Sequence, residues 1–245
     1  MTTSTLAYPL PESAALGLAP RLLTAALFIT TAVLSFLPIA ILGPAIGWPA
    51  SLRAPAAEQL AAIAAAPAAV AAGYGVYLLY SILVLPVMVL LAHRVCGRLW
   101  RPVAAVVVGF AALSVLARSI GILRWLTVMP ALARQHAGES LDRRQMIETI
   151  FSAVSTYGGG IGELLGVSLF MGLSLGLAML AALAYQSLPR WLCVSGLISA
   201  VMLLSLFLPA LGIPLHMPIA LAATALSVWM LAAGVVLGFR PRSNA

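Results

Sequence analysis

YGGGIGELLGV, residues 157–167, opens a long apolar run and places one carboxylate, Glu163, among glycines. An unpaired carboxylate in hydrocarbon is costly, so Glu163 requires a partner, a proton or water. Gly158, Gly162 and Gly166 are spaced by four, which gives a helix a smooth face that another backbone can approach closely. The stretch therefore predicts a membrane helix packed against a neighbour that carries positive charge.

The composition of the whole chain indicates a membrane protein. Of its 245 residues, 63% are hydrophobic and 8% are charged, and the mean hydropathy is +1.10. A water-soluble domain of this length needs far more charge to cover its surface. We therefore expect an all-α, polytopic membrane bundle that forms a single domain over residues 1–245.

Six apolar stretches are long enough, at about 20 helical residues each, to cross the hydrocarbon core. They cover residues 21–44, 68–92, 103–129, 160–186, 191–212 and 217–239. Two connections, 47–67 and 134–157, are too long for simple turns, and each carries helix signals such as Pro55, Pro67 and Ser140. We predict a short interfacial amphipathic helix on the outer side in each. The second helix either lies flat on the surface or tips into the bundle, and the three glycines that follow it offer a break before the next span.

The basic residues orient these spans. All thirteen are arginine, and the absence of lysine beside abundant alanine is typical of a GC-rich bacterial genome. Seven arginines flank one side and four lie on the other, so the positive-inside rule places both termini in the cytoplasm of a bacterial inner membrane. The first group is Arg21, Arg94, Arg98, Arg101, Arg190, Arg240 and Arg242, and the second is Arg53, Arg134, Arg143 and Arg144. Because topology explains the net charge of +7, we expect no nucleic-acid partner.

Two further arginines lie inside the third predicted span. From an inner boundary near Val103, the helical rise places Arg118 about 22 Å into the membrane and Arg124 near the outer interface. Glu163 enters the next span from the same side, so the three side chains should meet at similar depth. We expect Glu163 to pair with Arg118 before Arg124, because Arg118 cannot easily extend its side chain to the interface.

Two arginines against one glutamate leave a positive charge that suits a small anionic ligand. Glu148 could supply the missing countercharge if its helix tips inward. The candidate ligand-binding residues are Arg118, Arg124, Glu163, Glu148 and Tyr157, and Glu163 is also the candidate catalytic acid. The structural alternative is a buried ion pair that fixes the register of two helices.

Other polar side chains receive structural interpretations. Tyr74, Tyr77 and Tyr80 begin the second predicted span and are expected to lie at the interface or to pack. The histidines and cysteines match no metal-ligand spacing, so we expect neither a metal nor another cofactor.

Four motifs carry a family resemblance: RWLTVMPALA (124–133), IFSAVSTYGGGIGELLG (150–166), LPRWL (188–192) and SVWMLAAGVVL (227–237). In their order, the second half of the chain resembles an uncharacterised family of bacterial multi-pass membrane proteins. The resemblance implies a six-helix inner-membrane protein and no particular activity. Some relatives carry histidine after the glutamate, where this chain has Leu164, which weakens a metal or proton-relay interpretation.

These observations favour a protein that binds or passes a small amphiphilic or anionic molecule at a polar pocket in the outer half of the membrane. One alternative is an intramembrane enzyme in which Glu163 protonates a lipid or isoprenoid. Another is a structural or regulatory partner of a second membrane protein. Membrane lipid is the expected surrounding partner, and the glycine-rich helix face could pair two copies of the chain.

Overall fold

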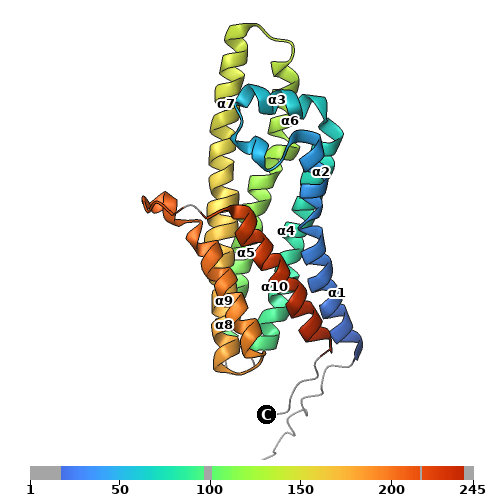
Figure 1. Ribbon diagram of the computed structural model, residues 1–245, viewed down its shortest axis with the longest axis vertical. Helices are drawn as coiled ribbons and strands as arrows, with labels where there is room; N and C mark the ends of the chain where they lie inside the picture. Colours follow the sequence, from blue (N-terminus) through green and yellow to red (C-terminus); the bar gives the residue numbers. More distant parts are fainter. Residues whose placement is uncertain (1–17, 97–100, 216, 240–245) are drawn as a thin grey trace, which may run out of the picture.

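The computed structural model describes residues 18–96, 101–215 and 217–239, and every regular element within these ranges is a helix. Most helices run along one long axis (Figure 1). In chain order they are α1 (Leu18–Leu34), α2 (Leu37–Ile46), η1 (Ala50–Arg53), α3 (Ala56–Ala65), α4 (Pro67–Val95), α5 (Arg101–Leu126), α6 (Val128–His136), α7 (Leu141–Gly159), η2 (Gly160–Phe170), α8 (Met171–Ala184), α9 (Arg190–Ser205), η3 (Leu208–Leu211) and α10 (Ile219–Phe239).

The two ends of the bundle differ. At one end α1 begins and α10 ends, and Nη2 of Arg21 donates a hydrogen bond to the carbonyl oxygen of Gly238 at 3.1 Å. At the other end α3 lies across the bundle, next to α6 and α7, and α7 extends beyond it (Figure 1). We call these the terminal end and the cap end.

Among the residues that the structure describes, five helical segments are long and apolar enough to cross a membrane, which makes the protein a multi-pass membrane protein by length and composition. They are 19–46, 67–95, 101–136, 141–184 and 219–239. The remaining predicted span, 191–212, is shorter than expected: α9 has 16 residues, or about 24 Å, against about 30 Å of hydrocarbon. Pro209 and Pro214 follow soon after its end, and proline disfavours the continuation of a helix because it lacks an N–H group.

The predicted break at the three glycines is wrong. Residues 141–184 form one continuous helical segment of 44 residues, and Gly159 and Gly160 keep right-handed helical backbone angles. Ile147 and Phe151 are buried against the core at the cap end, where Phe151 contacts Trp125 edge-on at 6.3 Å. This packing holds α7 upright as an extension of the span (Figure 1). Its N-terminal boundary at Ser140 agrees with the sequence.

The first long connection contains the predicted short helix. Pro55 is the N-cap residue of α3, and the next helix, α4, begins at Pro67. Nε2 of Gln59 donates to the carbonyl oxygen of Ala54 at 2.8 Å and holds η1 against α3. We call η1 and α3, residues 50–65, the cap.

The glycine spacing that predicts close helix contact is confirmed between α5 and η2. A Cβ atom on Gly121 would lie 2.7 Å from Cα of Gly162 and 2.9 Å from the carbonyl oxygen of Gly158. One turn nearer the terminal end, the hydroxyl of Ser114 donates to the carbonyl oxygen of Gly166 at 2.8 Å. The smooth face is therefore used inside the chain, where it brings two backbones into direct contact.

We expect Gly121→Ala to lower the free energy of unfolding by about 1–3 kcal/mol, as overpacking does, because the new methyl group meets backbone that cannot move aside. The measurement is the apparent melting temperature in a mild detergent. Gly109→Ala is the matched control on the same helix, since its Cβ would meet nothing within 4 Å. Equal melting temperatures for the two variants would contradict the contact.

Candidate functional site

Toward the cap end, charged and aromatic side chains from three helices gather around the contact between α5 and η2. We call this set the arginine–tyrosine cluster. Its members are Arg118 and Arg124 on α5, Tyr74, Tyr77 and Tyr80 on α4, and Glu163 on η2.

Arg118 is the most deeply buried charge of the cluster, with 3% of its surface exposed. Its guanidinium lies over the ring of Tyr80, with Cζ 4.6 Å from the ring centroid, and Tyr77 is its second neighbour. Such contacts offset part of the cost of burying a cation. The stem of Arg118 lies along Gly166, where a Cβ would approach Cγ of the arginine to 2.7 Å.

Gly158 and Gly159, the first two of three consecutive glycines, leave room for the side chain of Arg124. A Cβ on Gly158 would collide with Nη1 of Arg124 and would lie 2.7 Å from its Cδ, while one on Gly159 would lie 3.5 Å from Nη2. The guanidinium also lies over the ring of Trp125 at 5.5 Å. These glycines therefore form the surface on which the arginine rests.

Several hydrogen-bond donors of the cluster have no acceptor among the described residues. Nε of Arg118, Nε and Nη1 of Arg124 and the hydroxyl of Tyr74 are all buried without a partner. Tyr74 is 2% exposed and stacks on Trp125, with the ring centroids 4.8 Å apart. Buried donors without acceptors are costly, so the cluster favours a group that brings oxygen acceptors.

Glu163 does not form the predicted ion pair. Among the described residues its carboxylate has no arginine nitrogen within 4.0 Å, and Arg124 rather than Arg118 is the charge that acts on it. The expected order of contact is thus wrong, because the guanidinium of Arg118 lies on Tyr80. Glu163 is instead exposed at the helix surface.

The position of Glu163 follows from the geometry of η2, which is a π-helix. Hydrogen bonds in a π-helix join residues five apart, so Glu163 lies nearly in line with Ser168, one turn closer to the cap end. The hydroxyl of Ser168 donates to the carbonyl oxygen of Leu203 in α9 at 2.6 Å. Glu163 therefore lies about one turn beyond the residue of η2 that bonds to α9, and its electrostatic neighbours are Arg124 on α5 and Tyr74 and Tyr77 on α4.

Two predicted ligand-binding residues lie elsewhere. Oε1 of Glu148 is 2.8 Å from Nε2 of His136, so this carboxylate is paired with α6 and does not balance the arginines. The side chain of Tyr157 is 75% exposed. The sequence interpretation of Tyr77 and Tyr80 as packing residues missed their contact with Arg118, although their three-residue spacing is the signal that places both on one helix face.

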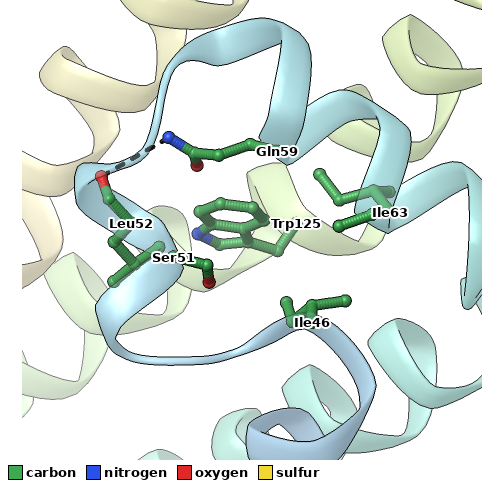
Figure 2. A pocket seen from close by; sticks show the side chains of 7 residues that line it. Ile46, Ser51, Leu52, Gln59, Ile63 and Trp125 are labelled. Carbon is green, nitrogen blue, oxygen red and sulfur yellow. Dashed lines mark hydrogen bonds between the residues drawn. The ribbon is translucent and has the colours of Figure 1, made fainter.

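The cap closes the cluster from above. Trp125 stacks on Tyr74 and also lines a small cavity under the cap, with Gln59 and Ile63 among the other residues around it (Figure 2). The volume of this cavity is about 10 Å³, enough for about one water molecule. Trp125 is 4% exposed, so its ring is packed between Tyr74 and the cap.

The donor set of the cluster points to an anion. Guanidinium groups bind carboxylate and phosphate oxygens through charge-assisted hydrogen bonds. Within the described ranges no three His, Cys, Asp or Glu side chains gather as metal ligands. The cluster therefore presents guanidinium groups of the kind that bind oxyanions.

Comparison with known proteins gives a family and no function. The family described as "Domain of unknown function (DUF4386)" matches residues 23–234, a segment that includes the whole cluster. No curated protein and no solved structure matches the chain.

We expect Gly158→Ala to destabilise the protein through Arg124, because the added methyl group takes the place of the guanidinium. In the double variant Gly158→Ala/Arg124→Ala this penalty should largely disappear, with a coupling free energy of about 0.5–3 kcal/mol in a double-mutant cycle. Thermal unfolding in detergent measures all four proteins. Gly160→Ala is the control, since its Cβ meets nothing within 4 Å; additive effects at 158 and 124 would exclude the contact.

Proposed function

The chain belongs to the DUF4386 family, and we propose that it is an inner-membrane protein that binds a small anionic molecule at the arginine–tyrosine cluster. The observation that carries the proposal is the group of buried donors without acceptors on Arg118, Arg124 and Tyr74. An oxyanion placed between the two guanidinium groups would accept from them. Hydrogen bonds to charged groups each contribute about 1.5–3 kcal/mol.

The charge balance supports the same ligand class. Arg118 and Arg124 contribute two positive charges, and Glu163 contributes at most one negative charge, so the cluster is net positive without a ligand. Glu148, the nearest further acid in the sequence, is paired with His136. An anion would bring the cluster close to neutrality, which a low-dielectric environment favours.

The two alternatives receive less support. Acid catalysis by Glu163 needs a second acid or base, and Glu148 is held 2.8 Å from His136. A partner that docks on the glycine face would need Gly158, Gly162 and Gly166 free, and these three pack against α5. Binding, with or without passage across the membrane, is the function that these contacts favour.

We further propose that the membrane is a bacterial inner membrane crossed six times, with α9 and α10 as the last two segments. The apolar side chains exposed along α5 end at Leu123, about 33 Å from Arg101 at the helical rise, which matches the thickness of the hydrocarbon core. In this frame Arg118 lies within the hydrocarbon. The cap and the N-terminal end of α7 would then lie at or beyond the outer interface.

The proposed orientation has both termini in the cytoplasm. Arg21, Arg94, Arg101 and Arg190 lie at or near helix ends on the terminal side. Arg98, Arg240 and Arg242 lie outside the described residues.

Cysteine labelling tests this orientation. With Cys96 and Cys193 replaced by alanine, Ser140→Cys should react with a membrane-impermeant maleimide in intact cells, because the loop before α7 is outside. Gln186→Cys, at an exposed position in the α8–α9 turn, should react only after the membrane is permeabilised. The opposite pattern would reverse the proposed orientation.

Anion binding is tested with two probes, inorganic phosphate and dodecyl phosphate, added to the purified protein in a neutral detergent. At least one should raise the apparent melting temperature, and Arg118→Lys and Arg124→Gln should each weaken binding about 10-fold or more, as expected for loss of a charge-assisted hydrogen bond. Arg53→Gln is the matched control, because it removes an exposed arginine outside the cluster.

Glu163→Gln is expected to be as stable as the unmodified protein, so a change in its anion binding cannot be attributed to unfolding. Because Glu163 is exposed and has no ion pair within the described residues, the substitution should change the free energy of unfolding by less than about 0.5 kcal/mol. It should also tighten anion binding, since it removes the negative charge that competes for Arg124. Loss of binding in Glu163→Gln, or no response of the unmodified protein to either probe, would refute the proposal.

A further inference from the structure

We infer that the ligand is an anionic lipid with a small headgroup, which reaches the arginine–tyrosine cluster sideways from the hydrocarbon, past the end of α9. The inference rests on the proposed anion site and adds the source of the anion and its route. Three observations carry it: an exposed side, a closed end, and an apolar surface below the exposed side.

The exposed side results from the length of α9. At its last turns α9 packs closely on the long helix: a Cβ on Gly172 would lie 2.7 Å from Cγ of Leu204, and Ser168 bonds the carbonyl oxygen of Leu203. The chain then leaves this face, because α9 ends at Ser205. The next turn of the π-helix carries Glu163, which is exposed, and Arg124 is the charge that acts on it.

The closed end is the aqueous one. Trp125 and Tyr74 are 4% and 2% exposed, and the cavity between Trp125 and the cap has room for about one water. Gln59 ties the cap loop to α3 through the carbonyl oxygens of Leu52 and Ala54 (Figure 2). A phosphate or carboxylate ion that approaches from solution at the cap end therefore contacts packed aromatic rings. A ligand that approaches from the membrane contacts the side of the bundle where Glu163 is exposed.

The apolar surface is the segment after α9, which projects from the side of the bundle about halfway along its length (Figure 1, orange). Residues 209–215 are all exposed, and Leu211, Ile213 and Leu215 expose 63%, 47% and 41% of their surface. A hydrocarbon chain whose headgroup lies at the cluster can run toward the terminal end along this segment. A headgroup drawn below the interface loses its hydration, so a bare phosphate or carboxylate, with few polar atoms left unpaired, fits better than a bulky headgroup.

The test compares the same headgroup with and without a tail. Dodecyl phosphate should bind at least about tenfold more tightly than inorganic phosphate, because only the former buries apolar surface. Leu211→Ala/Ile213→Ala should weaken dodecyl phosphate several-fold and leave inorganic phosphate unchanged. Leu116→Ala/Ile120→Ala, which shortens exposed side chains on α5, is the matched control and should change neither.

A dodecyl phosphate analogue with a diazirine at the end of its tail then maps the route. Photolabelling should mark residues 205–215, and Arg124→Gln should reduce the labelling. Labels confined to the cap, residues 50–65, would overturn the sideways route. Equal, arginine-dependent binding of both phosphates would overturn the lipid source and leave the anion site standing, whereas binding of neither would remove the proposed function itself.

Discussion

The direct backbone contact between Gly121 and Gly162 is the constraint on which the rest of this end of the bundle depends. With no Cβ on either residue, α5 and η2 approach until backbone atoms touch. That separation leaves no room for a side chain at the contact itself, and Arg118 and Arg124 lie on either side of it. Each instead lies over a further glycine, Gly166 or Gly158. Small residues thus do more than let two helices pack: they provide the room in which two cations can be held within a membrane-spanning segment.

Much of the architecture follows from apolar run length. Composition predicts the multi-pass helical bundle, the glycine period predicts the helix contact, and Pro55 and Pro67 predict the boundaries of the short helix between them. These inferences succeed because each depends on interactions within a few residues or on one repeated spacing. The resemblance over the second half of the chain is likewise confirmed by the family match to residues 23–234.

The sequence fails where the outcome depends on competition between distant groups. The three glycines predict a break, but burial of Ile147 and Phe151 keeps the helix continuous. Opposite charges predict a salt bridge, but the guanidinium of Arg118 reaches the ring of Tyr80 instead. The change from α to π geometry in η2 changes the direction of the side chains on this stretch, Glu163 among them, and no local pattern in the sequence predicts this change. The sequence therefore identifies the charged residues of the candidate site and misses the role of its tyrosines.

Stability alone is a weak reason for such an arrangement. A buried ion pair could hold the helix register, yet the structure keeps Glu163 away from Arg118 and leaves buried donors on two arginines and Tyr74 without acceptors. The buried serines of the same helices have partners: Ser114, Ser168 and Ser174 each donate to a carbonyl oxygen of a neighbouring helix. Sites that depart from local consistency are where proteins concentrate function. Here the departure coincides with a π-helix, a geometry frequent at functional sites, and with the exposed carboxylate of Glu163, on which Arg124 acts.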